Sequence, residues 1–521
     1  MVGGQYESFS QRDITGERTG LISTDIQSLS TTTGIDSRGA EIAPILLGGY
    51  DEWAVGGFFG RLNYNYKHRY LLEANLRYDG SSRFRKDNRW LFVPSFSIGW
   101  NISEEDFFNV DIVDQLKVRA SYGSLGNQNT HYWYPTYITQ PVGVQNGSWL
   151  VSGSRPNTSY APGLLSQDLT WEKVESFNYG LDFALLNSKL SGSFDYFVRN
   201  TLDMVGPGEE LPNVLGASVP SRNNTDLQTY GWDFSIGWND RVDLGSNQLH
   251  YGVTLTLSDS QTEVTKYPNK TNSLSTFREG QKLGEIWGYE TIGIAKTDEE
   301  MKSHVASLPE GGQFGLSNLG AGDIMYKDLN NDGRISPGAN TLDNPGDRKI
   351  IGNNTPRYRL GTTLNASYKG FDIRAFFQGV LKRDYATSSQ MFYPGGWVWG
   401  IIVMDEQLDY FRADADHPLG QNLDPYYARP HHMDDRNRHA QTKYLLNASY
   451  VRLKNLTLGY TFPNKIVDRI GISKLRVYLS GENLFTITGL TKIYDPEFIR
   501  TDARNSYPIS RTYSVGLNIT L

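Results

Sequence analysis

The sequence predicts an all-β fold, a transmembrane antiparallel up-and-down β-barrel, and three observations support this prediction. Segments that alternate apolar and polar residues recur along the 521 residues, and they come in pairs. The connections between these segments alternate between short and long to the end of the chain. No stretch approaches the roughly 20 consecutive apolar residues of a membrane helix, so strands must do the spanning.

About fourteen segments carry the strand pattern. They lie near 1–9, 55–66, 69–79, 91–102, 115–125, 172–186, 189–201, 226–239, 247–262, 356–368, 371–382, 448–461, 474–487 and 510–521. Within these segments, the even positions of 95–102 and 116–123 are apolar and the odd positions are small, polar or charged. In 513–521 the odd positions are apolar. A barrel would turn the apolar face to lipid and the polar face to a wet or plugged lumen.

The lengths of the connections separate a membrane barrel from a soluble sandwich. The short connections are 67–68, 103–114, 187–188, 240–246, 369–370 and 462–473. The long connections are 10–54, 80–90, 126–171, 202–225, 263–355, 383–447 and 488–509. Greek-key sandwiches have no reason to sort connections in this way, whereas outer-membrane barrels have short periplasmic turns and long extracellular loops. We therefore expect 263–355 and 383–447 to be large extracellular loops.

The composition agrees with a barrel and argues against other classes. Hydrophobic residues make up only 38% of the chain, which suits strands with one lipid-facing residue in two. The absence of Cys fits passage through an oxidising compartment. The net charge of -7 and the lack of a long basic run argue against nucleic acid. Tyr64, Tyr66 and Tyr70 flank the first short turn, as an aromatic girdle at a membrane interface requires.

At these segments the sequence resembles the C-terminal part of a SusC/RagA-type TonB-dependent outer-membrane transporter. The matching stretches follow in family order over nearly the whole chain. They are GRLNYNYKHRYLL (60–72), RYDGSSRF (77–84), LKVRASYG (116–123), WEK (171–173), NYGLD (178–182), GDI (322–324), DLNNDG (328–333), YVRLKNLTLGY (450–460) and SGENLF (480–485).

This resemblance implies a barrel of about 22 strands around an N-terminal plug. It also implies a segment that couples to TonB and a SusD-like lipoprotein lid on the extracellular side. The chain departs from the family at its start, because residues 1–9 resemble a mid-barrel strand and no signal peptide, coupling segment or plug is found. We therefore expect residues 1–521 to be a partial TonB-dependent receptor β-barrel domain without the plug. About fourteen strands alone would leave two raw edges, which lipid does not tolerate.

The sharpest local motif is Asp328-Leu329-Asn330-Asn331-Asp332-Gly333-Arg334, which has the spacing of a calcium loop. The side-chain oxygens of Asp328, Asn330 and Asp332 and the carbonyl of Arg334 would be the ligands. The position of the bidentate Glu of an EF-hand holds Ala339. The motif thus predicts Ca²⁺ in an extracellular loop, with an ion-free Asx-rich turn as the alternative.

Two loop segments are rich in aromatic residues, namely 131–137 with Trp133 and Tyr134, and 392–399 with Trp397 and Trp399. Flat rings with polar tips stack on sugars and pack well at protein interfaces. We expect these residues to contact the ligand or the lid, and the alternative is that they form the core of the loops.

Catalysis has little support in the sequence. His431-His432 followed by Asp434-Asp435 resembles a metal-ligand cluster, but adjacent residues of an extended loop point apart. Nucleophile-elbow and phosphate-loop motifs are missing. The sequence therefore predicts no catalytic residue, and no cofactor besides the loop Ca²⁺.

Three functions remain open. The first is active import of a nutrient oligomer, glycan or peptide, across the outer membrane, with TonB coupling through the missing N-terminal part. The second is a passive porin-like channel of about fourteen strands, in which the strand at 1–9 pairs with the strand at 510–521. The third is a surface β-protein that binds carbohydrate without a membrane role.

Overall fold

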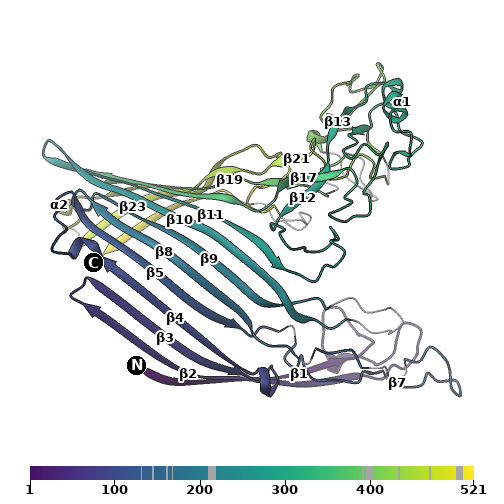
Figure 1. Ribbon diagram of the computed structural model, residues 1–521, viewed down its shortest axis with the longest axis horizontal. Helices are drawn as coiled ribbons and strands as arrows, with labels where there is room; N and C mark the ends of the chain where they lie inside the picture. The colour runs from purple at the N-terminus through teal and green to yellow at the C-terminus, as the bar shows by residue number, and fades with distance from the viewer. Residues whose placement is uncertain are drawn as a thin grey trace.

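One antiparallel sheet of fourteen strands makes up most of the computed structural model (Figure 1). The structure describes residues 1–130, 132–143, 146–159, 162–166, 168–208, 219–389, 392–394, 404–431, 434–468, 471–499 and 509–521. The strands of the sheet are β1 (Val2–Glu17), β2 (Ile45–Tyr66), β3 (Tyr70–Ser81), β4 (Trp90–Asn101), β5 (Val113–Asn127), β8 (Glu172–Leu185), β9 (Leu190–Gly206), β10 (Arg222–Leu244), β11 (Asn247–Lys266), β18 (Arg357–Tyr368), β19 (Phe371–Lys382), β22 (Tyr450–Thr461), β23 (Lys474–Thr488) and β24 (Thr512–Thr520).

Each strand pairs with the next strand of the sheet in chain order, so the predicted up-and-down topology is confirmed. All fourteen predicted strands are present. The short connections gather at one end of the sheet, which we call the turn end, and the long ones gather at the other, the loop end (Figure 1). Both described ends of the chain, at β1 and β24, lie toward the turn end (Figure 1).

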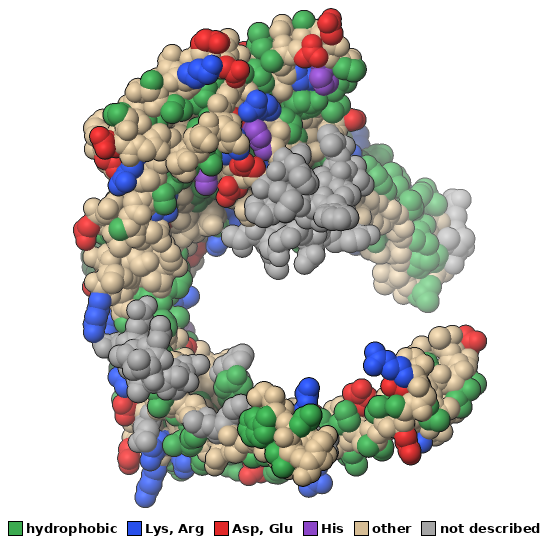
Figure 2. Space-filling model, turned by 90° about the vertical axis from the view of Figure 1, so that its right-hand side faces the viewer, with side chains coloured by type: hydrophobic (Ala, Val, Ile, Leu, Met, Phe, Trp, Pro, Cys, Tyr) green, Lys and Arg blue, Asp and Glu red, His purple; other side chains and the backbone are tan. Residues whose placement is uncertain are grey.

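The sheet curves into an open ring around a hollow (Figure 2). In the described part of the chain, β1 pairs with β2 and β24 pairs with β23, and no pairing joins β1 to β24. The pairing that the porin hypothesis requires is therefore not present between the described strands. No helix among the described residues is long and apolar enough to cross a membrane.

The two faces of the sheet differ as the alternation predicts. In β4, Phe96 and Ile98 point outward and are 44% and 58% exposed. Their pairing partners on β5, Tyr122 and Ala120, continue the same face. The polar positions between them, such as Ser97 and its partner on β5, line a cavity of about 510 Å³ on the concave side. The apolar face thus covers the outside of the ring and the polar face lines the hollow, which we call the lumen.

The prediction that residues 10–54 form one loop is wrong. β1 continues to Glu17 and β2 begins at Ile45, and Ser10 to Glu17 pair in unbroken register with Ile45 to Glu52. Backbone hydrogen bonds hold this extension of the hairpin, although its residues carry no clear alternation of apolar and polar types. The hairpin therefore extends further toward the loop end than the sequence pattern indicates.

The longest connections carry small elements of their own. They are β6 (Val142–Gly143), β7 (Thr158–Ser159), β12 (Glu285–Tyr289), β13 (Thr291–Ile294), α1 (Asp298–Ala306), β14 (Gly312–Gln313), β15 (Ile324–Tyr326), β16 (Arg334–Ile335), β17 (Arg348–Asn353), β20 (Asp384–Ala386) and β21 (Leu445–Asn447). A short helix, α2 (Asn464–Val467), lies in the connection from β22 to β23.

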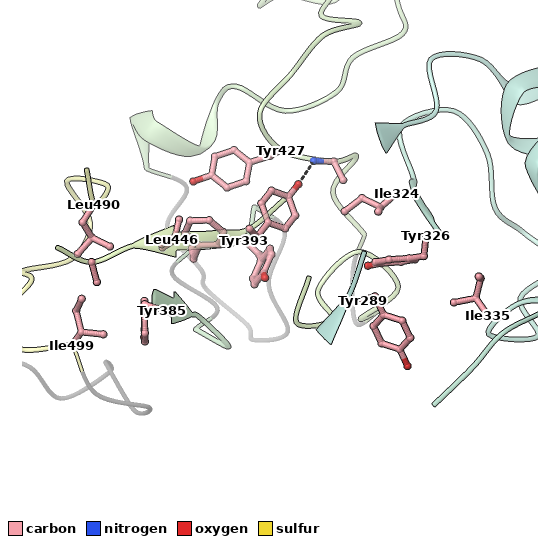
Figure 3. Close-up of a cluster of buried hydrophobic side chains, with 14 of the residues drawn as sticks. Tyr289, Ile324, Tyr326, Ile335, Tyr385, Tyr393, Tyr427, Leu446, Leu490 and Ile499 are labelled. Atoms are coloured by element: carbon pink, nitrogen blue, oxygen red, sulfur yellow. Dashed lines mark hydrogen bonds between the residues drawn. The ribbon is translucent and has the colours of Figure 1, made fainter. Parts of the chain in front are cut away.

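Three connections pack into one compact unit above the sheet, which we call the loop body. It comprises the described residues of 267–356, 383–449 and 489–499. Its core is rich in aromatic residues, and each connection contributes side chains to it (Figure 3). They include Tyr289, Ile324 and Tyr326 from the first connection, Tyr385, Phe392, Tyr427 and Tyr444 from the second, and Leu490 and Ile499 from the third.

Candidate binding surface at the loop end of the sheet

An aromatic cluster lies on the lumen face at the loop end of β1 and β2. Phe9 and Trp53 are register partners, and their rings stack with centroids 6.0 Å apart. Trp133, from the connection after β5, meets Phe9 edge-on at 5.5 Å. The backbone N–H of Glu52 donates to the Tyr134 hydroxyl at 2.7 Å. The predicted aromatic segment is thus held against the wall by one ring contact and one hydrogen bond.

The same segment borders the largest of the described cavities, of about 820 Å³. The rings of Tyr132, Trp133, Tyr134 and Tyr137 line it together with the Asp51 carboxylate. Tyr132 and Tyr137 are 69% and 62% exposed. Ligand pockets typically measure about 300–1,000 Å³ and combine apolar walls with a few polar groups. The cavity can therefore hold a small oligomer in contact with several flat rings.

Only part of the second predicted aromatic segment, 392–399, lies within the described residues. Trp397 and Trp399 lie outside the described residues. Phe392 and Tyr393 are described and are buried in the loop body, at 0% and 6% exposure. For these two residues the alternative named above, a role in the core of the loops, is the observed one. Burial raises the pKa of the Tyr393 hydroxyl far above its usual range, so the core keeps this group neutral.

A buried carboxylate joins two connections of the loop body. Asp323, which is fully buried, accepts hydrogen bonds from His431 Nε2 at 2.6 Å and from Asn437 Nδ2 at 3.0 Å. Arg429 donates to the same carboxylate at 3.1 Å. Burial alone would raise the pKa of Asp323, but the hydrogen bonds from His431 and Asn437 outweigh burial and lower it. Asp323 therefore stays ionised at neutral pH.

The candidate cluster at His431 is thus part of a hydrogen-bond network. Asp434 binds Arg436 at 2.5 Å, which holds the pKa of Asp434 down at about 2. His432 lies outside the described residues. Among the residues that the structure describes, no group of three or more His, Asp or Glu side chains is placed to hold a metal ion.

The predicted calcium loop folds as a tight Asx-rich turn. Asp328 accepts hydrogen bonds from the N–H groups of Asn331 at 2.7 Å and Gly333 at 2.9 Å. The Asp332 carboxylate accepts from its neighbours, including Arg334 Nε at 3.3 Å. Gly333 has φ of +74°, a left-handed conformation that favours glycine. The turn therefore has the backbone shape that the motif predicts, and calcium binding stays a prediction.

Close beside this turn lies Asp347, which is fully buried and accepts the N–H groups of Leu329 and Ser336 at 2.9 and 2.8 Å. Burial raises the pKa of Asp347, and the negative charges of Asp328 and Asp332 raise it further. The three carboxylates therefore repel one another, although they are not arranged as a set of ligands for one ion in this structure. A cation bound in the turn would reduce this repulsion.

Ion pairs line the lumen wall, and their partners could not be predicted from the sequence pattern. Arg119 on β5 binds Asp182 on β8 at 3.1 Å and Asp195 on β9 at 2.6 Å. Arg476 on β23 binds Asp372 on β19 at 2.6 Å. The register between strands decides these pairs, so alternation within one strand identifies the face but not the partner.

Comparison with known proteins places the fold and the family. A family described as "TonB dependent receptor-like, beta-barrel" matches residues 2–484. The TonB-dependent receptor P3 of Formosa agariphila is 29% identical over 500 residues, which are 90% of this chain and 46% of that protein. The TonB-dependent receptor SusC of Bacteroides thetaiotaomicron is 28% identical over 480 residues, which are 89% of this chain and 43% of that protein. The chain spans about half the length of these relatives.

Solved structures agree on the fold. The RagAB peptide transporter has a TM-score of 0.74 and 22% identity, over 99% of this chain and 52% of that chain. The RagAB peptide importer in its open-open state has a TM-score of 0.74 over 100% of this chain and 52% of that chain. At this identity the likeness shows a shared architecture, and it carries no statement on what this chain binds.

Proposed function

Because this chain belongs to the TonB-dependent receptor β-barrel family of the outer membrane, we propose that it takes part in active import of nutrient oligomers, glycan or peptide. In this proposal residues 1–521 form a large part of the barrel wall and the loops at the extracellular mouth. The observation that carries the proposal is the aromatic cavity at the loop end, which lies on the lumen face of an outer-membrane type of sheet.

The geometry suits capture of an oligomer before it enters the lumen. The exposed rings of Tyr132 and Tyr137 offer flat faces for stacking, and Trp133 is held in place by Phe9. Below the cavity the lumen wall is polar, with ion pairs such as Arg119 with Asp182. A ligand released from the rings would therefore enter a wet, charged passage. No covalent step is part of the proposal, since binding and movement suffice for import.

Two partners belong to the proposal. A SusD-like lipoprotein would cover the loop end as a lid, and TonB would supply energy through an N-terminal part of the protein. The support is the likeness to SusC and to RagAB. RagAB is described as a peptide transporter and has been solved in open-open and closed-closed states. The loop body offers the lid a folded surface, because three connections share one core.

Uptake assays test the function. Deletion of the gene in its host should abolish growth on, and uptake of, at least one oligomer in a panel of glycans and peptides. Deletion of tonB should have the same effect, because import against a gradient needs energy coupling. Uptake that persists without tonB would contradict active import and would favour a passive channel.

A single substitution tests the site. Trp133→Ala should weaken binding of the transported oligomer about fivefold to tenfold, because it removes a large ring and frees the neighbouring tyrosines. Trp149→Ala is the matched control, since Trp149 lies in the same connection, is 56% exposed and does not line the cavity. Equal affinity of both variants in a titration of the purified protein would exclude the cavity as the binding site.

A further inference from the structure

A second cavity, of about 310 Å³, opens on the lumen face where β18 and β19 meet the loop body. Two arginines line it, Arg359 near the start of β18 and Arg383 directly after the end of β19. In Figure 1, β19 runs from the sheet toward the loop body, so the cavity lies at the loop end of the wall. Neither arginine was singled out by the sequence pattern.

Neither guanidinium pairs with a carboxylate in the described part of the chain. Arg383 donates to two backbone carbonyl oxygens, of Asn354 at 2.9 Å and of Ile499 at 3.1 Å, and both are neutral acceptors. Arg359 has no ion pair or hydrogen bond from its side chain to any described residue. Burial lowers the pKa of Arg383, and the like charge of Arg359 adds a smaller effect in the same direction.

The carboxylate that lines this cavity already has cationic partners. Glu497 lines the cavity but accepts Arg452 at 2.8 Å and Lys454 at 3.1 Å. Asp495 binds Arg452 as well, at 2.8 Å. The charges of these four side chains cancel, so among the residues that line the cavity the charges of Arg359 and Arg383 have no counter-charge of their own.

Other arginines near the loop end or in the lumen wall have carboxylate partners. Arg357, two residues from Arg359, binds Asp259 at 2.5 Å, and Arg119 binds two aspartates. Arg383 is half-buried and Arg359 is exposed, so the cost of burying a cation falls on Arg383, and the two like charges at one cavity repel each other. An anion in the cavity would offset both effects.

We propose that Arg359 and Arg383 bind an oxyanion, a carboxylate or sulfate group carried by the imported oligomer. The inference rests on the proposed import function and names a charge preference for its ligand. Guanidinium groups match the planar or tetrahedral oxygen array of such anions with two parallel hydrogen bonds. The hydroxyls of Thr256 and Ser258 and the amide of Gln378 line the same cavity and can bind the remaining oxygens.

The size of the cavity limits what enters it. About 310 Å³ is near the lower limit for ligand pockets, so it holds one sugar ring or one residue of an oligomer. The aromatic cavity lies over the opposite part of the sheet, between the connections of β1, β5 and β9. The two cavities would therefore bind different parts of a ligand. The rings would contact its flat neutral units, and the arginines would bind a charged unit.

Thermal unfolding of the full-length protein in detergent tests the proposal without transport. The probes are inorganic sulfate and D-galacturonate, each compared with sodium chloride at equal ionic strength, which removes general screening. Either probe should raise the melting temperature of the wild type in a saturable way. Arg359→Gln should raise the probe concentration at half-maximal shift about tenfold or more, because charge-assisted hydrogen bonds to the anion are lost. A response to sulfate only or galacturonate only identifies the group.

Two further variants complete the test. Arg374→Gln is the matched control, because Arg374 lies on β19, the strand that pairs with β18, has no ion pair among the described residues and does not line the cavity. It should keep the wild-type response. Arg359→Glu should raise the melting temperature without any probe, because its carboxylate would face Arg383, and should abolish the response. Equal responses of Arg359→Gln and wild type, or no probe response in the wild type, would overturn the proposal and leave the import function untouched.

Discussion

Asp323 shows how one side chain can organise a large loop. The carboxylate has no exposed surface, and its side-chain hydrogen-bond donors come from a connection more than a hundred residues away, while the Gly320 N–H donates locally. Removing a buried carboxylate of this kind is costly, because several buried donors lose their hydrogen-bond acceptor at once. We therefore expect this residue to matter more to the loop body than any single tyrosine of its core.

Asp323→Ala should destabilise the loop body by about 3 kcal/mol, since His431, Asn437 and Arg429 lose their acceptor. Hydrogen exchange of residues 320–330 and 428–440 measures the effect directly. Asp416→Ala is the control, because its exposed side chain makes no contact of this kind. Unchanged exchange in Asp323→Ala would show that the core holds the loops without the carboxylate.

The Asp323 carboxylate also makes the stability of the loop body depend on pH. The pKa of Asp323 is lower in the folded state than the unfolded value of about 3.9. Its contribution is therefore complete at pH values above about 4 and is lost as the pH falls through the folded pKa. Protection of the loop body against exchange, corrected for the intrinsic rate at each pH, should fall below pH 4 in the wild type, and Asp323→Ala should lack this step.

Calcium binding at Asp328 is a separate prediction at the same scale. Millimolar Ca²⁺ should raise the melting temperature of the loop body, because the cation offsets the repulsion of Asp328, Asp332 and Asp347. Asp328→Asn should weaken the effect at least tenfold. Isothermal titration measures both, and Mg²⁺ serves as the control ion. No heat of binding in the wild type would favour the ion-free turn.

At the scale of the elements, the turns show what local sequence can specify. In the turn from β2 to β3, Lys67 and His68 both have positive φ, of 51° and 57°. Two left-handed residues in succession define the turn that fits the twist of a tight hairpin, and Asn-Gly prefers it most. The short length of this connection was evident from the sequence, but its strained conformation was not, because Lys and His rarely adopt it.

Replacing Lys67-His68 by Asn-Gly should therefore stabilise the hairpin by about 1 kcal/mol, since both new residues accept positive φ at little cost. The melting temperature of the protein in detergent measures the change. Replacement by Val-Val should have the opposite sign, because β-branched residues resist positive φ. If Asn-Gly destabilised the protein, contacts of Lys67 or His68 would outweigh the backbone effect.

The strands were predictable and the loop body was not, for a physical reason. Most strands of the sheet have one apolar face on the outside of the ring, which produces a period of two in the sequence. The extension of the hairpin of β1 and β2 lacks this period, and the sequence pattern missed it. The core of the loop body is assembled from three connections, and residues such as Tyr326, Tyr427 and Ile499 carry no shared local period. Likewise, Trp133 stands out in the sequence as part of an aromatic loop segment. Arg359 and Arg383 can be recognised as a candidate site only once β18 and β19 lie side by side and place both at one cavity.

At the scale of the whole molecule, the open ring of strands predicts that β1 and β24 do not pair with each other. Ser8 is the register partner of Ala54, and Ser480 is the register partner of Ser514. Because the chain has no Cys, engineered pairs report single contacts without background. Cysteines at 8 and 54, or at 480 and 514, should form disulfides readily. Cysteines at 8 and 514 should not, as gel mobility with and without reductant would show, and efficient crosslinking of that pair would revive the fourteen-strand channel.

The shared core of the loop body also bears on how this surface can diversify. A change in one of these three connections disturbs side chains supplied by the other two. No described residue of the connection that carries Trp133 belongs to that core. Insertions and substitutions between homologues should therefore concentrate in residues 128–171. The ligand specificity of the aromatic cavity should change faster in evolution than that of the rest of the loop end.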